Sequence, residues 1–195
     1  LRGVPVRVRP RAPKKMEDLK KFYLGNNYNL HMYEGLIGFF MRLSHKKMEK
    51  CIKKKSNILE IGPGTHPHIK YLKHDFDNYY VLDRVKELSS FYSNMSKVKF
   101  VHHSTNKLPF DDNFFDRIIL SHCLEHIVNP EEILIEIYAK LKKGGNLTIA
   151  LPTDPGLMWR FGKFISANFL IKKNYDYSKD YYYYITAKDH VNSIF

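Results

Sequence analysis

The sequence of 195 residues has little cysteine and no long apolar run. Its two cysteines, Cys51 and Cys123, lack the close spacing of a disulfide scaffold or a zinc finger. No apolar stretch reaches the ~18 residues that a membrane span needs, and no apolar core follows the basic N-terminus, as it would in a signal peptide. We therefore expect a cytoplasmic protein with no transmembrane segment, although peripheral contact with a membrane stays open.

Acidic residues are also scarce, because 20 Asp and Glu face 32 Lys and Arg, a formal net charge of +12. Six of the basic residues lie within residues 1–15, which contain no acid, so half of the excess belongs to this segment. We expect residues 1–15 to be a Pro/Arg extension without fixed structure, either attached to the protein or translated upstream of a natural start at Met16. The alternative is a basic arm that binds nucleic acid.

No internal repeat is visible, and the length suits one well-buried domain. Residues 16–56 have a helical pattern, and after them short apolar runs alternate with helical segments as far as residue 152. Strands are predicted at 57–61, 79–83, 98–101, 114–120 and 146–151, and helices near 66–74, 85–95 and 130–141, the last stopped by Gly144 and Gly145. This alternation predicts an α/β fold with a doubly wound, mostly parallel Rossmann-like sheet over residues 57–152.

Two features at predicted strand ends suit a nucleotide-like ligand. The first strand ends in the turn Glu60-Ile61-Gly62-Pro63-Gly64, where glycine lets the backbone approach a ligand. Asp83 ends the second strand, at the distance from such a turn where an acid accepts hydrogen bonds from ribose hydroxyls. The complete Gly-x-Gly-x-x-Gly of dinucleotide sites is missing, since position 67 is Pro. These features predict a nucleotide site but not which nucleotide.

Four segments together resemble one enzyme family. Residues 60–65 are similar to motif I of the class I S-adenosylmethionine-dependent methyltransferases. Residues 108–116 resemble the "LPF…FD" signature of its small-molecule (type 11) group, residues 121–127 its "S…LEHI" segment, and residues 141–145 its "LKPGG" turn. The resemblance covers residues 57–152 and implies an enzyme that binds S-adenosyl-L-methionine and releases S-adenosyl-L-homocysteine.

The resemblance also implies roles for individual residues. Glu60 would lie beneath the turn, the turn would face the methionine part of the cofactor, and Asp83 would bind the ribose hydroxyls. The other implied contacts with the cofactor are His66 beside the turn, Arg84, Ser104, Thr105, Asn106 and Leu108 around the adenine, and Ser121 and His122 near the methyl group. Two residues depart from the family pattern, because His66 replaces a third glycine and Ser104 replaces an acid that meets the adenine amino group.

Methyl transfer is a direct displacement for which the cofactor supplies the electrophile, so the protein mainly aligns the reacting atoms. An oxygen, nitrogen or carbon of a small-molecule, lipid or glycan-linked acceptor would receive the methyl group. A hydroxyl acceptor also needs a base, and His122 is our candidate. The alternative for His122 is packing or contact with the cofactor, and for Glu125 and His126 we favour capping or core hydrogen bonds over catalysis.

Other functions stay open as minor hypotheses. No third ligand accompanies the close histidine pairs, so we predict no metal site. The residues after the fourth strand lack the Asn/Asp-Pro-Pro-aromatic motif of nucleic-acid amino methyltransferases, which makes an RNA substrate a minor alternative. A non-catalytic partner module with the same fold is the other alternative.

Residues 153–195 break the strand–helix rhythm and are rich in aromatic side chains. The pattern at 157–171 predicts an amphipathic helix that packs on the domain, or a lid over the substrate. The family resemblance implies two further strands after residue 151, and we expect this closing hairpin to be absent or very incomplete, with the chain a fragment. The oligomeric state is left open.

Overall fold

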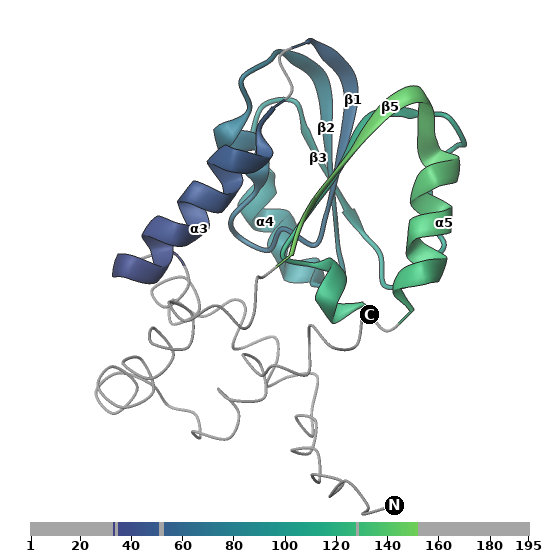
Figure 1. Ribbon diagram of the computed structural model, residues 1–195. Coiled ribbons are helices and arrows are strands. Elements are labelled where there is room, and N and C mark those ends of the chain that lie inside the picture. The colour runs from purple at the N-terminus through teal and green to yellow at the C-terminus, as the bar shows by residue number, and fades with distance from the viewer. Residues whose placement is uncertain (1–32, 34, 51–52, 128, 152–195) are drawn as a thin grey trace, which may run out of the picture.

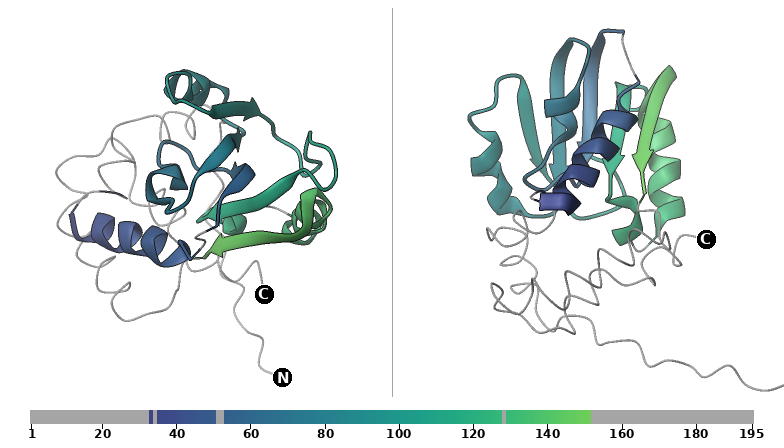
Figure 2. Two further views of the ribbon diagram at one scale, coloured as in Figure 1. Left: turned by 90° about the horizontal axis from the view of Figure 1, so that it is seen from above. Right: turned by 60° about the vertical axis from the view of Figure 1, so that its left-hand side comes forward.

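The computed structural model describes residues 33, 35–50, 53–127 and 129–151 (Figure 1). Five strands form one sheet in the order β3-β2-β1-β4-β5, and every neighbouring pair is parallel. Helices α3 and α4 lie on one side of the sheet and α5 lies on the other, as Figures 1 and 2 show. The prediction of a doubly wound, mostly parallel sheet is confirmed.

The strands match the apolar runs of the sequence closely. Their bounds are β1 Lys55–Ile61, β2 Phe76–Asp83, β3 Val98–His102, β4 Phe115–Ser121 and β5 Leu141–Ala150. The helices are α3 Gly35–Met48, η1 His68–Tyr71, η2 Lys86–Leu88, α4 Ser89–Tyr92, η3 Leu124–His126 and α5 Pro130–Lys140. The helix expected at 85–95 is only the short pair η2 and α4. None of the helices among the described residues is long and apolar enough to cross a membrane.

One structural detail corrects a prediction. Helix α5 ends at Lys140, so Gly144 and Gly145 do not stop it. Both glycines lie within β5, where Gly144 has a φ of +78°. The β4–β5 pairing is shifted there, because Phe115 pairs with Leu141 whereas Arg117 pairs with Asn146. The glycines therefore accommodate an irregularity in the edge strand rather than a helix terminus.

Side chains alternate between the two faces of the sheet, as they must in a strand. On the α5 face, Leu59, Ile118 and Leu120 form one apolar cluster with Ile133 and Ile137 of α5. On the other face, a second cluster packs the sheet against η2 and α4; its fully enclosed members are Ile58, Tyr79, Val81, Leu88, Tyr92 and Ile119. The core therefore has two apolar layers, separated by the sheet.

Several predicted segments lie outside the described residues. Residues 1–15, the first part of the 16–56 helical segment and residues 153–195 with the expected closing hairpin are among them. Helix α3 is the described part of the N-terminal helical segment. The predictions for the remaining segments stay predictions.

Candidate functional site

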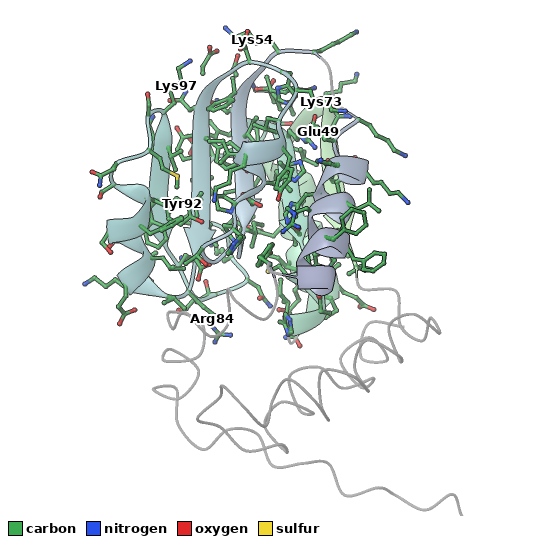
Figure 3. All side chains as sticks on the ribbon, turned by 90° about the vertical axis from the view of Figure 1, so that its left-hand side faces the viewer. Glu49, Lys54, Lys73, Arg84, Tyr92 and Lys97 are labelled. Carbon is green, nitrogen blue, oxygen red and sulfur yellow. The ribbon has the colours of Figure 1, made fainter. Side chains whose placement is uncertain are left out.

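The chain reverses its direction across the sheet between β1 and β4, since β2 and β3 extend to one side and β4 and β5 to the other. In open parallel sheets, ligands bind beyond the carboxyl ends of the strands at such a reversal. Figure 3 shows Arg84, which follows β2, at this end, and Lys54 and Lys97, which precede β1 and β3, at the opposite end. The candidate site is thus formed by the residues that follow β1, β2 and β4.

The two glycines of the turn after β1 serve different purposes. Gly62 has a φ of +65° and Gly64 a φ of +59°, a conformation that side chains disfavour. A Cβ atom on Gly62 would collide with the Sγ atom of Cys123 after β4, whereas one on Gly64 would meet nothing within 4 Å. Gly62 therefore permits close packing of two loops, and Gly64 leaves open space at the end of β1.

Asp83 joins the end of β2 to this turn. Its carboxylate accepts hydrogen bonds from the backbone N of Gly64 at 3.2 Å and of Val85 at 2.9 Å. The residue is 6% exposed. Burial raises the pKa of Asp83, and the backbone donors offset only part of that effect. A carboxylate has about four acceptor positions, so each oxygen of Asp83 retains capacity for a ligand hydroxyl.

Glu60 lies beneath the turn and is fully buried. Both of its carboxyl oxygens are 2.9 Å from the backbone N of His68, and Oε2 accepts a hydrogen bond of 2.7 Å from the Tyr79 hydroxyl. Burial raises the pKa of Glu60 to about 7. The Glu60 carboxyl group therefore holds the segment after the turn, at His68, against the sheet, at Tyr79.

The turn is also held from its two flanks. On the α4 side, the Tyr92 hydroxyl donates a hydrogen bond of 2.5 Å to the carbonyl oxygen of Gly64. On the α3 side, the ring of Tyr33 stacks on His66 with centroids 3.4 Å apart. Burial lowers the pKa of His66 to about 4. His66 is therefore a neutral ring, covered on one face, where the family pattern has a glycine.

The loop after β3 lies beside the end of β2. The backbone N of His103 donates to the carbonyl oxygen of Asp83 at 3.0 Å, which connects this loop to the end of β2. Ser104, Thr105 and Arg84 are exposed. The side-chain amide of Asn106 donates to Glu132 on α5. Leu108 is buried in the cluster that packs against α5, so its side chain contacts the core.

Strand β4 ends at Ser121, and His122 follows it next to helix α3. His122 has a φ of +51°, which is uncommon for a residue other than glycine. Its Nε2 atom lies 3.2 Å from the Ser44 hydroxyl, and burial lowers its pKa to about 4. His122 is therefore a neutral imidazole that a helix before the sheet holds in place.

Helix α3 contributes residues that the sequence analysis missed. Ser44 and His45 contact His122 and Ser121, and Glu49 lies one residue beyond the end of the helix. His45 and Glu49 are both buried. The signal in the sequence was a histidine and a glutamate four residues apart, and therefore on one helix face, inside a segment that otherwise looked like a basic surface.

Two further side chains of note, Cys123 and Glu125, follow β4. Oε2 of the buried Glu125 has no hydrogen-bond partner among the described residues, and the preference for capping or core hydrogen bonds over catalysis stays a prediction. Burial raises the pKa of Glu125 to about 7. Burial also raises the pKa of the Cys123 thiol to about 12, which makes a cysteine nucleophile unfavourable there. Within the described part of the chain, no three potential ligands are grouped as a metal site would require.

The comparisons with known proteins converge on one family. A family model described as a methyltransferase domain matches residues 59–149. A demethylmenaquinone methyltransferase of Clavibacter sepedonicus is 42% identical over 59 residues, which are 30% of this chain and 24% of that protein. The chain thus matches only about a quarter of the length of this curated relative.

Solved structures agree in fold. An S-adenosyl-L-methionine-dependent methyltransferase of Methanococcus maripaludis superimposes with a TM-score of 0.56 at 19% identity, over 94% of this chain and 87% of that one. The N-methyltransferase NodS of Bradyrhizobium japonicum, solved with S-adenosyl-L-homocysteine, gives a TM-score of 0.56 at 15% identity, over 68% and 70% of the two chains. At these identities the likeness concerns the fold alone.

Proposed function

Because residues 59–149 form a class I S-adenosylmethionine-dependent methyltransferase domain of the type 11 group, we propose that this chain transfers a methyl group from S-adenosyl-L-methionine to a small-molecule acceptor. S-adenosyl-L-methionine is the cofactor of this enzyme class. The observation that carries the proposal is the contact between the two predicted halves of the cofactor site. The Gly64 backbone N donates to Asp83, and the space above Gly64 is open.

In this proposal the methionine end of the cofactor lies along the turn at residues 60–64 and beside His66. The Asp83 carboxylate accepts hydrogen bonds from the ribose hydroxyls. Arg84, Ser104, Thr105 and Asn106 surround the adenine on the flank formed by the loops after β2 and β3, and Leu108 supports this flank from the core. Ser121 and His122 lie at the methyl end, because β4 is the neighbour of β1 at the reversal in the sheet.

The protein residues position the reacting atoms, and the sulfonium of the cofactor supplies the electrophile. His122 remains our candidate base, because it follows β4 at the predicted methyl end; burial lowers its pKa to about 4, which keeps the imidazole neutral and makes it a weaker base than a free histidine. Its contact with Ser44 would fix the ring orientation during that step.

For the acceptor we favour a small aromatic molecule of the quinol type. The curated relative described above, from Clavibacter sepedonicus, acts, by its name, on demethylmenaquinone. The aromatic residues of 157–184 would suit such a molecule, and equally a lipid or a glycan-linked acceptor. A non-catalytic partner module stays the second candidate, and a cytoplasmic location stays a prediction.

The cofactor assignment is tested by calorimetric titration of S-adenosyl-L-methionine into the full chain and the variant Asp83→Ala. We expect the variant to bind at least about tenfold more weakly, because hydrogen bonds to a charged group contribute roughly 1.5–3 kcal/mol. Asp77→Ala is the matched control, since Asp77 lies near the start of the same strand and is exposed. Equal affinities for the Asp83 variant and the natural protein would refute the ribose assignment.

Turnover is tested separately by measuring release of S-adenosyl-L-homocysteine with pooled small-molecule acceptors, quinols included. Product that depends on an acceptor supports the enzyme. Binding of the cofactor without any product, in this chain and in one extended beyond Phe195, would favour the partner module.

A further inference from the structure

A chain of buried polar side chains connects helix α3 to the last residue of β4. The Ser121 hydroxyl lies 3.4 Å from Nε2 of His45, and Nδ1 of His45 lies 3.0 Å from Nδ1 of His68. Nε2 of His68 lies 3.0 Å from Oε2 of Glu49. His45, His68 and Glu49 are all buried. Three segments that are distant in sequence therefore share one line of hydrogen bonds, which ends at the candidate site.

Arg117 determines the ionisation state of Glu49, the residue at the other end of this line of hydrogen bonds. Its side chain is 1% exposed, and Nη1 lies 2.7 Å from the same Glu49 oxygen that contacts His68. Figure 3 places Glu49 where α3 meets the sheet. Burial opposes ionisation of Glu49, but the hydrogen bonds from Arg117 and His68 outweigh burial, and its pKa is lowered. Glu49 is therefore a carboxylate, which can only accept hydrogen bonds.

The direction of every other hydrogen bond follows from that carboxylate. His68 must donate to Glu49 from Nε2, so a neutral His68 has its lone pair on Nδ1. His45 must then donate from Nδ1, which leaves the lone pair of His45 on Nε2. Ser121 must donate its only hydroxyl proton to that nitrogen. Burial lowers the pKa of His45 to about 3 and also lowers that of His68, so both rings are neutral at physiological pH.

We propose that Glu49, His68 and His45 form a directed hydrogen-bond chain in which the Ser121 hydroxyl always donates its proton to His45. Ser121 can then only accept a hydrogen bond from the methyl acceptor, and it therefore selects acceptors with an O–H or N–H donor. The inference rests on the proposed function, because it concerns the acceptor side of the same site. It narrows the substrate class to molecules such as quinols, phenols and amines. Quinones, fully alkylated ethers and tertiary amines lack the donor.

The physical basis of the selection is the limited capacity of a hydroxyl group. A serine hydroxyl has one donor and two acceptor positions, and a free hydroxyl can rotate to suit either kind of ligand. Here rotation would break the bond to His45 and leave a buried imidazole nitrogen without a partner. An acceptor that offered only an oxygen lone pair would therefore face another lone pair and lose one hydrogen bond, a discrimination of roughly tenfold.

His45, His68 and Glu49 are positioning residues in this proposal, since they act on the acceptor through Ser121. The neighbouring pair of Ser44 and His122 has the same kind of contact, 3.2 Å between hydroxyl and Nε2. Among the described residues, no carboxylate is seen to fix the direction of the hydrogen bond between Ser44 and His122. The two pairs therefore offer a matched comparison within one protein.

The first test is the tautomer of each ring, measured by multiple-bond ¹⁵N–¹H correlation spectra of the full chain. We expect His45 to carry its proton on Nδ1 and His68 on Nε2. In Ser121→Ala the Nε2 resonance of His45 should move towards the position of an unbonded nitrogen, and Ser121→Thr should restore it. Ser44→Ala should instead move the resonance of His122. The opposite tautomer at His45, or no response of His45 to Ser121→Ala, would overturn the directed chain.

The second test measures selection with a probe pair, 2-naphthol and 2-methoxynaphthalene, titrated into the protein saturated with S-adenosyl-L-homocysteine. We expect the naphthol to bind about tenfold more tightly and Ser121→Ala to remove that preference. Equal affinities in the natural protein, or no binding of either probe, would overturn the selection. Saturation with S-adenosyl-L-homocysteine is measured first, so that a failure of the cofactor assignment is recognised independently.

Discussion

The two faces of the sheet bury different chemistry. On the α5 face, Ile118 and Leu120 of β4 meet Ile133 and Ile137, and the contacts are apolar. On the α3 face, Arg117 of the same strand meets Glu49, and the rings of His45 and His68 continue the polar contacts. On that side Ile119 of β4 belongs to the second apolar cluster, so one strand there carries a buried ion pair beside apolar contacts.

This difference indicates that the apolar clusters and the polar contacts around α3 have separate roles. Apolar burial stabilises by roughly 25 cal/mol per Å² and is tolerant of geometry. A buried ion pair adds little net stability, because desolvation of both charges offsets their attraction, but it is strongly destabilising to break. The apolar clusters on both faces therefore supply the stability of the domain, whereas the polar contacts around α3 fix the orientation of the groups beside the candidate site.

The largest effect should come from breaking the ion pair. Glu49→Ala leaves Arg117 buried without its carboxylate, which should lower the free energy of unfolding by about 3–5 kcal/mol. Urea denaturation followed by circular dichroism measures the loss. The double variant Glu49→Leu with Arg117→Met should lose much less, since it removes both charges. A double variant as unstable as the single one would contradict the separation of roles.

A cavity on the α5 face should have a somewhat smaller effect on stability and none on the site. Ile137→Ala removes a fully enclosed side chain, which should cost about 3 kcal/mol. The affinity for S-adenosyl-L-homocysteine, measured below the unfolding transition, should stay within about twofold of the natural value. A large loss of affinity would show that the two faces are coupled.

The stability of the protein should decrease at low pH because of His122, which contacts α3. The unfolded chain protonates His122 around the ordinary histidine pKa of 6.5, whereas the folded protein does so only near pH 4, so stability falls as the pH drops between these values. In His122→Asn this contribution is absent, and asparagine tolerates the positive φ. The stability difference between the natural protein and the variant should therefore shrink by about 3 kcal/mol from pH 7 to pH 4. A difference independent of pH would mean that His122 titrates normally.

The smallest effect should come from the outer side of α5. Ile135 is 71% exposed, two residues from the enclosed Ile137. Ile135→Gln should change the free energy of unfolding by no more than about 0.5 kcal/mol. This variant is the matched control for Ile137→Ala, and a loss close to that of Ile137→Ala would indicate that Ile135 is covered by another part of the molecule.

Local sequence patterns were enough to predict the strands and the turn. Apolar runs have a clear boundary at Gly62 and at Asp83, and the order of the motifs agrees with the sheet that the structure contains. The roles assigned to individual cofactor residues stay predictions. Helix ends were predicted less well, because the two glycines in β5 have the composition of a helix terminus but accommodate a shifted strand pairing.

The polar chain on the α3 face could not be predicted by the same means. Arg117 and Glu49 are 68 residues apart in sequence, and Ser121 and His45 are 76 residues apart. Helix periodicity indicates which side of α3 is buried but not which strand it meets. A charged residue in the middle of an apolar strand, such as Arg117, was a further local sign that a buried partner exists.

The hydrogen bond from Gly64 to Asp83 also bears on the thermodynamics of ligand capture. In the proposed site the turn and the acid are joined by this hydrogen bond, so binding of a ribose there would cost little further conformational entropy. Association should accordingly be accompanied by a heat-capacity change that reflects buried ligand surface rather than the ordering of a loop. Replacement of Asp83 would remove both the contact and this preorganisation, so its effect on affinity combines two losses.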